Sequence, residues 1–240
     1  MAERAAIVTG GSSGIGFAIA RMLLDEGYGV TVSARRPKKL EAAAADLAQN
    51  GGEVQHVAGN MASEEAVQQV VAAHRARFGR LDVLVNNAGV GIGAAVGEIQ
   101  TKFLDMQIGV NLRSYVLFYR ECVELLKAAG AEHRNALVVN TSSIAGKKGE
   151  AWLSVYAATK HGVIGFTQAM NRELNGDGIK SCALCPGFVD TAMTDFVKGS
   201  VSPEDMIRPE DISEAVRMLL RVSPNCVIPE LIFQRPGEAF

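Results

Sequence analysis

The sequence has few cysteines, few aromatic residues and no long apolar run. Cysteine occurs four times, and Phe, Trp and Tyr together make up 6% of the 240 residues. No uninterrupted apolar stretch approaches the roughly 18 residues that a transmembrane helix needs. Lys and Arg number 24 against 26 Asp and Glu, which gives a formal net charge of −2. These features predict a protein without a disulfide scaffold and without a membrane or nucleic-acid partner.

Metal-binding and redox motifs are equally sparse. The four histidines have no metal-ligand spacing, so no metal is expected. Cys182 and Cys185 form a C-x-x-C, but they lie in the apolar run 179–185, which is typical of a buried strand, whereas a redox C-x-x-C opens a helix. The first residues show no signal-peptide pattern, and together with the few cysteines this predicts a cytoplasmic protein with reduced thiols.

Short apolar runs alternate with longer amphipathic stretches along the chain. Strands are predicted over 5–8, 30–33, 54–57, 81–85, 136–140, 179–185 and 227–233. Helices are predicted over 14–27, 40–50, 63–79, 112–129, 154–174 and 211–220. This alternation is typical of βαβ units and a parallel sheet. We therefore predict one α/β domain over 1–240, a Rossmann-type doubly wound parallel sheet of about seven strands with helices on both faces, and a substrate lid around 190–210.

A glycine-rich turn separates the first predicted strand from the first predicted helix. Glycines allow a tight turn and let backbone N–H groups approach a pyrophosphate, and the helix N-terminus adds a favourable dipole. The spacing G-x3-G-x-G differs from the commonest dinucleotide fingerprint, and the alternative is a loop that serves turn geometry alone. The position between strand and helix favours phosphate binding by Gly10, Ser12, Ser13, Gly14 and Gly16.

The end of the second predicted strand indicates which dinucleotide would bind. An NAD site usually places a carboxylate there, which binds the ribose 2′-hydroxyl. Residues 33–39 contain no acid and four basic side chains, among them Arg35 and Arg36. A guanidinium matches a phosphate in a planar, bidentate manner, so this segment predicts NADP(H) over NAD(H). The alternative is a solvated basic loop.

Tyr156 and Lys160 are four residues apart in a predicted helix and therefore share one face. An ammonium close to a phenol is expected to lower the phenol pKa, which would make Tyr156 a proton donor and acceptor near neutral pH. Ser143 follows a predicted strand, at the edge of the sheet where ligands bind in open parallel sheets. Taken alone, Tyr156 or Ser143 would more often serve packing or capping.

These motifs occur together with three others in a fixed order. The additional motifs are Asn86-Asn87-Ala88-Gly89 after the fourth strand, Asn111 in the next helix, and Pro186-Gly187 after the sixth strand. Over residues 7 to about 191, the sequence resembles the short-chain dehydrogenase/reductase family of the Tyr-x3-Lys type. Within it, the sequence is similar to 3-oxoacyl-acyl-carrier-protein reductases and related carbonyl reductases.

The resemblance implies a role for each matching residue. Tyr156 would be the general acid in carbonyl reduction, and Lys160 would bind the nicotinamide ribose and bias the Tyr156 pKa. Ser143 would bind the substrate oxygen, and Asn111 would hold a water that links Lys160 to solvent. Further cofactor contacts would come from Ile15, Asn60, Met61, Asn87, Ala88, Gly89, Pro186, Gly187, Val189 and Thr191. Many relatives have Asp-Val where this chain has Asn60-Met61, and the amide could still pair with the adenine edge.

The C-terminal segment departs from the pattern of many relatives, which end in a glycine-rich Val-Asp-Gly-Gly. Residues 227–236 read VIPELIFQRP instead. Because this tail helps to build a subunit interface in many relatives, the resemblance implies a homo-oligomer and leaves homodimer and homotetramer open.

The substrate site is expected near the catalytic motifs in sequence. Mostly apolar residues flank those motifs and predict an apolar pocket for a ketone, aldehyde or secondary alcohol, namely Ile92, Gly93, Ala94, Ala145, Trp152, Leu153, Phe188, Met193 and Phe196. Lys147 and Lys148 could meet an acyl-carrier protein or coenzyme A, although a solvated role is favoured. The interpretation is an NADP(H)-dependent oxidoreductase. A 3-oxoacyl thioester reductase and a non-catalytic dinucleotide-sensing or assembly protein are the alternatives.

Overall fold

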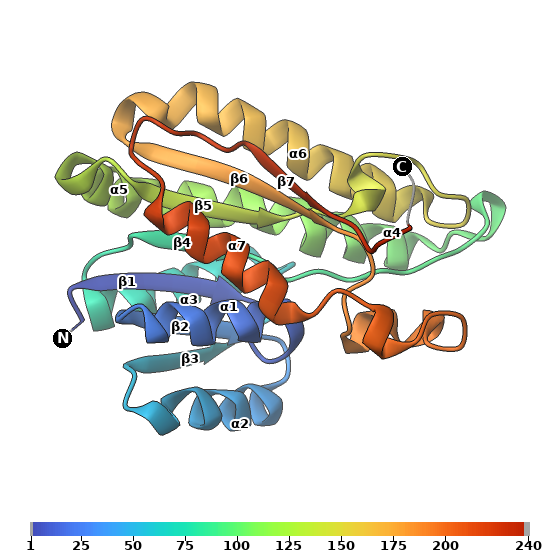
Figure 1. Cartoon of the computed structure of the whole chain (residues 1–240), viewed down its shortest axis with the longest axis horizontal. Helices are drawn as coiled ribbons and strands as arrows, with labels where there is room; N and C mark the ends of the chain where they lie inside the picture. Colours follow the sequence, from blue (N-terminus) through green and yellow to red (C-terminus); the bar gives the residue numbers. More distant parts are fainter. Residues whose placement is uncertain (1, 238–240) are drawn as a thin grey trace.

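Seven parallel strands form the centre of the molecule (Figure 1). The computed structural model describes residues 2–237. The sheet order is β3-β2-β1-β4-β5-β6-β7, so the chain winds outward from β1 in one direction and then, from β4, in the other. The strands are β1 (Arg4–Thr9), β2 (Tyr28–Ala34), β3 (Val54–Ala58), β4 (Val83–Asn86), β5 (Ala136–Thr141), β6 (Ile179–Pro186) and β7 (Glu230–Phe233). The predicted doubly wound sheet is confirmed.

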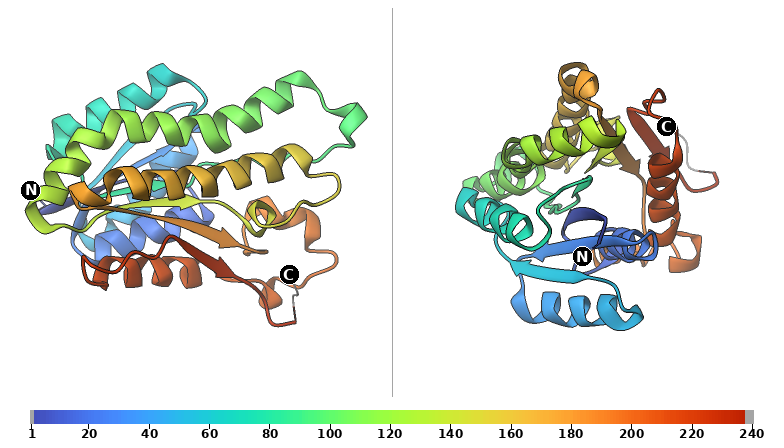
Figure 2. Two further views of the ribbon diagram at one scale, coloured as in Figure 1. Left: turned by 90° about the horizontal axis from the view of Figure 1, so that it is seen from above. Right: turned by 90° about the vertical axis from the view of Figure 1, so that its left-hand side faces the viewer.

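Helices cover both faces of the sheet (Figure 2). One face packs against α1 (Gly14–Asp25), α2 (Pro37–Leu47) and α7 (Pro209–Arg221). The other packs against α3 (Glu64–Phe78), α5 (Ser114–His133) and α6 (Ser154–Leu174). Successive strand residues point to opposite faces, so Val8 belongs to the first core and Ile7 to the second. Among residues 2–237, none of the helices combines the length and the apolar character that crossing a bilayer requires.

Two predicted elements differ from the structure. The helix expected over 112–129 is the continuation of α4 (Thr101–Ile108), which runs through a π-helical stretch (Gly109–Arg113) into α5. The last strand begins at Glu230 rather than at position 227. Pro229 precedes it and has no N–H to donate, although its carbonyl accepts from Ala183 N–H at 2.9 Å. The short 3-10 helix Ala192–Val197 lies within the segment that was expected to form a lid.

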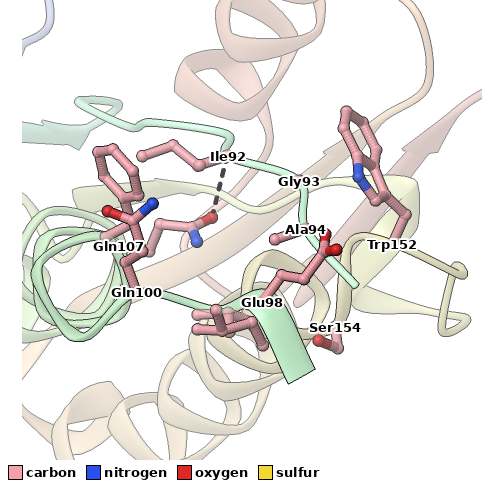
Figure 3. Close-up of a pocket in the computed structure, with 11 residues that line it drawn as sticks. Ile92, Gly93, Ala94, Glu98, Gln100, Gln107, Trp152 and Ser154 are labelled. Carbon is pink, nitrogen blue, oxygen red and sulfur yellow. Dashed lines mark hydrogen bonds between the residues drawn. The ribbon is translucent and has the colours of Figure 1, made fainter. Parts of the chain in front are cut away.

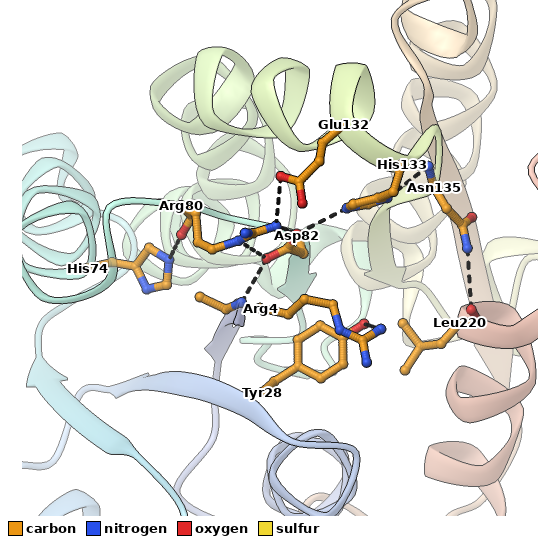
Figure 4. Close-up of polar contacts among 10 residues, drawn as sticks. Arg4, Tyr28, His74, Arg80, Asp82, Glu132, His133, Asn135 and Leu220 are labelled. Atoms are coloured by element: carbon orange, nitrogen blue, oxygen red, sulfur yellow. Dashed lines mark hydrogen bonds and ion pairs between the residues drawn. The ribbon is translucent and has the colours of Figure 1, made fainter. Parts of the chain in front are cut away.

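A buried carboxylate ties the strands together at the amino-terminal edge of the sheet (Figure 4). Asp82 accepts hydrogen bonds from Ala5 N–H at 2.7 Å, from Arg80 Nη2 at 2.7 Å and from His133 Nε2 at 3.0 Å. Burial alone would raise the pKa of Asp82, but these donors outweigh it and lower the pKa. This network links β1, β4 and α5, and leaves the opposite edge, where the strands end, for the functional site.

Candidate active site

The glycine turn has a shape that only glycine allows. Gly10 and Gly14 have φ of +68° and +56°. A Cβ on Gly16 would lie 2.4 Å from Asn87 Nδ2 and 2.6 Å from the Gly10 carbonyl oxygen. Ser13 is the N-cap of α1 but makes no side-chain capping bond. The turn therefore leaves a cradle at the N-terminus of α1 whose dipole and backbone geometry fit a pyrophosphate.

The loop after β4 is fastened to this cradle. Thr9 Oγ1 accepts from the N–H groups of Asn87 at 2.9 Å and Ala88 at 3.0 Å. The Asn87 side chain donates to the Thr9 carbonyl at 3.1 Å. A Cβ on Gly89 would lie 3.6 Å from Lys160 Nζ. The structure thus brings the predicted residues 87–89 between the glycine turn and the catalytic helix.

The end of β2 presents its two arginines to solvent. Arg35 and Arg36 are exposed, and within residues 2–237 neither guanidinium forms a hydrogen bond or ion pair with the protein. Asn60 is also exposed, and its Oδ1 accepts from Ala62 N–H at 3.2 Å. The Met61 side chain is buried in the core, with its sulfur 3.8 Å from Ser33 Oγ.

Ser143, Tyr156 and Lys160 converge at the ends of β5 and β6. The Ser143 hydroxyl accepts from Ala145 N–H at 3.1 Å and donates to the Pro186 carbonyl at 3.4 Å. Lys160 Nζ donates to the Thr141 carbonyl at 2.7 Å and lies 5.6 Å from the centre of the Tyr156 ring. The predicted catalytic group is therefore assembled within one region.

The expectation that Lys160 lowers the Tyr156 pKa is wrong for this structure. Burial raises the pKa of Tyr156, and the neighbouring Ser143 hydroxyl opposes that shift. Burial also lowers the pKa of Lys160 to about 8. The ammonium is turned to the Thr141 carbonyl rather than to the phenol. Tyr156 consequently keeps its proton at neutral pH, which is the form that a proton donor needs.

Asn111 anchors the substrate loop from the π-helical stretch. Its Oδ1 accepts from Val90 N–H at 2.8 Å, and its Nδ2 donates to the Val90 carbonyl at 2.9 Å and to Thr159 Oγ1 at 3.2 Å. The side chain is thus engaged by protein groups and positions the loop, whereas the resemblance implied that Asn111 holds a water. π-helical turns of this kind occur frequently at functional sites.

A cavity of about 400 Å³ lies beside the catalytic helix (Figure 3). Four predicted substrate residues line it, namely Ile92, Gly93, Ala94 and Trp152. The other predicted substrate residues are not among its lining residues, and Met193 and Phe196 are 48% and 66% exposed. The prediction of an apolar pocket is wrong in one respect, because polar side chains that sequence reasoning missed also line it, namely Glu98, Gln100, Gln107 and Ser154.

Trp152 closes one side of this cavity in a strained conformation. Its φ is +70°, and a Cβ on Gly93 would lie 2.3 Å from the indole ring. The Trp152 carbonyl also accepts from Ala94 N–H at 2.8 Å. A left-handed backbone is unfavourable for a bulky residue, and such strain concentrates at ligand sites. The absence of a side chain at Gly93 allows this contact between the two loops.

The segment after β6 returns to the glycine turn. Gly187 N–H donates to the Phe233 carbonyl at 2.9 Å, and Val189 is buried. A Cβ on Gly14 would lie 2.9 Å from Thr191 Cγ2, so Thr191 borders the phosphate cradle. Whether residues 190–210 act as a lid stays a prediction.

The basic residues beside the catalytic loop are already paired. Lys147 forms an ion pair with Glu230 at 2.9 Å, and Lys148 forms one with Glu150 at 3.2 Å. In the described part of the chain, no cluster of three or more His, Cys, Asp or Glu side chains could hold a metal ion.

Comparisons with known proteins agree with this architecture. A sequence model of the family described as short chain dehydrogenase matches residues 4–200. A Streptomyces coelicolor protein, provisionally described as a ketoacyl reductase, is 39% identical over 194 residues, which cover 80% of this chain and 73% of that protein.

Solved structures with the same fold include nucleotide complexes. A variant of the actinorhodin polyketide ketoreductase with NADPH has a TM-score of 0.87 and 33% identity, with 97% of each chain covered. A 3-ketoacyl-(acyl-carrier-protein) reductase from Brucella melitensis, complexed with NADH, has a TM-score of 0.87 and 26% identity, with 96% of each chain covered.

Proposed function

Because this chain belongs to the short-chain dehydrogenase family and is therefore an NAD(P)-dependent dehydrogenase or reductase, we propose that it reduces a ketone or aldehyde with NADPH, or oxidises the matching secondary alcohol. The observation that carries the proposal is the convergence of Ser143, Tyr156 and the buried cation Lys160, whose Nζ lies 5.6 Å from the centre of the Tyr156 ring. Tyr156 acts as the general acid and base.

Each residue of the site has its own role in the proposed reaction. The bound nicotinamide cofactor supplies the hydride. Ser143 and Tyr156 donate hydrogen bonds to the carbonyl oxygen of the substrate. These bonds hold the oxygen beside the Tyr156 hydroxyl. The Tyr156 phenol gives its proton to the oxygen as negative charge develops there. Lys160 Nζ, which lies 5.6 Å from the centre of the Tyr156 ring, would bind the ribose hydroxyls of the nicotinamide nucleotide.

The same proposal assigns NADP(H) as the preferred cofactor. The glycine cradle fits the pyrophosphate, while Arg35 and Arg36 are free to bind the 2′-phosphate and no acid in 33–39 opposes it. The two nucleotide-bound neighbours carry NADPH and NADH, so the argument rests on this chain's own residues. Replacing both arginines by Ala raises the KM for NADPH at least tenfold and leaves the KM for NADH unchanged. Arg172→Ala, at an exposed position on α6, serves as the matched control.

The test of the reaction is a panel of carbonyl compounds with NADPH, followed by the loss of its absorbance. Tyr156→Phe is expected to lower turnover by more than 100-fold and to leave NADP⁺ binding intact, because the ring stays and only the proton donor is removed. A wild-type chain that binds the dinucleotide but turns over no member of the panel would support a dinucleotide-sensing or assembly protein instead.

A 3-oxoacyl thioester reductase is the second candidate. The names of the Streptomyces relative and of both structural neighbours favour it. The ion pairs of Lys147 and Lys148 argue against a free basic patch for a carrier protein at that loop. Comparing acetoacetyl-coenzyme A with simple ketones distinguishes the two, since a dedicated thioester reductase prefers the thioester by orders of magnitude.

Location and assembly complete the proposal. We place the protein in the reducing cytoplasm, because all four cysteines are unpaired in the structure. We also propose a homodimer or homotetramer, since Ile108 and Val116 are large apolar residues exposed along the α4–α5 helix. Light scattering after size-exclusion chromatography tests the assembly.

A further inference from the structure

Gln107 is a buried residue whose side chain the protein uses only in part. It lies in the last turn of α4, is 2% exposed, and accepts a hydrogen bond from Ile92 N–H through Oε1 at 3.2 Å. Because a backbone N–H can only donate, the atom that faces Ile92 must be the oxygen. This contact fixes the orientation of the amide and places Nε2 on the side away from Ile92 (Figure 3).

The Gln107 Nε2 donor has no partner among residues 2–237. Within the described residues, no hydrogen bond joins Nε2 to the protein. Nε2 is not one of the fully buried polar atoms that lack a partner, and Gln107 lines the cavity. Because Nε2 is not sealed in the core, this donor is free to bind an acceptor in the cavity. The cavity is therefore built to receive a hydrogen-bond acceptor at this point.

This donor lies close to the proposed reacting centre. Ile92, which Gln107 binds, follows Gly91, and a Cβ on Gly91 would lie 3.7 Å from Tyr156 Cε2. Ser154 and Val155 line the same cavity and directly precede Tyr156. A molecule that presents a carbonyl to Tyr156 thus extends past Gln107.

The charge of the cavity limits what that acceptor can be. Glu98 is the ionisable residue among the lining residues, and no cation lines the cavity within the described chain. An anionic group would be repelled by the Glu98 carboxylate, whereas an uncharged oxygen would not.

We propose that Gln107 is a specificity-determining residue, which donates from Nε2 to a second, uncharged oxygen of a carbonyl substrate. The preferred substrates carry a keto, ester or hydroxyl oxygen beyond the reacting carbonyl, and compounds with a carboxylate at that place are disfavoured. That the first carbonyl is the reacting group rests on the proposed function, but the binding preference does not.

Three compounds test the preference. Ethyl acetoacetate and 2-heptanone have chains of equal length and differ in the second oxygen function, and acetoacetate carries a negative charge there. We expect kcat/KM with NADPH to favour ethyl acetoacetate about tenfold over each of the others. Binding is measured separately in the presence of NADP⁺ by the fluorescence of Trp152, which is the single tryptophan of the sequence and lines the cavity.

One substitution separates recognition from loop positioning. Gln107→Glu keeps an oxygen for Ile92 N–H and removes the donor, so the preference for ethyl acetoacetate over 2-heptanone should disappear in both kcat/KM and Kd. The Kd for 2-heptanone should change less than threefold. Gln69→Glu makes the same change at an exposed position on α3 and should keep the preference.

The outcomes distinguish this inference from the proposed function. If wild type binds ethyl acetoacetate preferentially and Gln107→Glu loses that preference, the inference holds even if no compound is turned over, in which case the proposed function fails. If wild type reduces ketones but shows no preference, or if Gln107→Glu retains it, the inference is overturned and the proposed function stands. Failure of wild type to bind either compound also overturns the inference.

Discussion

Lys160 is a cation held in an almost fully buried position, and this position has a cost for stability. Burial lowers its pKa from 10.5 to about 8, so the unfolded chain binds a proton more tightly than the folded one. The shift corresponds to roughly 3 kcal/mol of destabilisation at pH 7, partly offset by about 1 kcal/mol from the hydrogen bond to Thr141.

Lys160→Met is therefore expected to raise the free energy of unfolding by about 2 kcal/mol at pH 7 while abolishing turnover. The gain should shrink as the pH rises from 8 towards 10.5, because folded Lys160 is then neutral and removing the proton from the unfolded chain costs less free energy as the pH approaches 10.5. Urea denaturation of both proteins across this range measures the effect. A variant less stable than wild type at pH 7 would contradict the argument.

His74 contributes in the same direction, but in a more acidic range of pH. Its Nε2 donates to the Arg80 carbonyl at 2.8 Å and its Nδ1 lies 2.8 Å from Thr31 Oγ1. Burial lowers its pKa to about 4, and the unfolded state takes up the proton first as the pH falls below 6.5.

Between pH 7 and pH 5 the free energy of unfolding should therefore fall by about 2 kcal/mol through His74 alone. His74→Gln, which does not titrate, should lack that part of the pH dependence. His161→Gln, at an exposed position on α6, is the control and should keep it. Parallel denaturation curves for wild type and His74→Gln at both pH values would refute the assignment.

At the scale of elements, the π-helical stretch sets the geometry of the substrate loop. Gln107 lies just before this stretch and Asn111 lies within it, and their side-chain amides hold Ile92 and Val90. A π-helical turn contains one residue more than an α-helical turn. Removing one residue rotates the preceding part of the helix by about 100° relative to the part that follows.

Deletion of Val110 is expected to turn this stretch into a regular α-helix and to carry Gln107 away from Ile92. The protein should retain its helix content and its NADP⁺ binding, while kcat/KM for ketones falls by about 100-fold. Circular dichroism, cofactor titration and steady-state kinetics measure the three properties. Unchanged kinetics would show that the π-helical turn does not position the loop.

The same region shows where sequence reasoning ends. Short β-branched runs such as 136–140 identify the strands, because fully buried parallel strands are apolar on both sides. Residues 101–108 have no such signal, since only Gln107 is buried in α4 and its N-cap Gln100 makes no capping bond. Because α4 was not predicted, the polar side of the cavity was not predicted either. Glu98, Gln100 and Gln107 supply most of that side.

The grouping of the proposed catalytic residues could be predicted from their order in the chain and their spacing. Tyr156 and Lys160 lie within one helix, where a spacing of four fixes their relative direction. Their electrostatics were not predictable, because the direction of the Lys160 side chain towards the Thr141 carbonyl depends on how β5 packs against α6. Proximity in sequence therefore predicted the pair but gave the wrong sign for the Tyr156 pKa shift.

At the scale of the whole molecule, the two halves of the sheet meet at the site. The glycine turn follows β1, whereas Thr191 follows β6, and a Cβ on Gly14 would lie 2.9 Å from Thr191 Cγ2. A dinucleotide bound in the cradle would contact both segments. Because a ligand stabilises the conformation to which it binds, it would stabilise the two segments together.

NADP⁺ is therefore expected to slow amide hydrogen exchange in residues 10–16 and also in residues 188–206, although β1 and β6 are separated by β4 and β5. At a concentration 100 times its Kd, the slowing should approach 100-fold wherever local opening requires release of the ligand. Gly14→Ala, which adds a Cβ at a φ of +56° and against Thr191, should weaken binding and remove the protection in both segments together. Protection limited to residues 10–16 would show that residues 188–206 do not close on the cofactor, and the lid would then have to be sought elsewhere around the cavity.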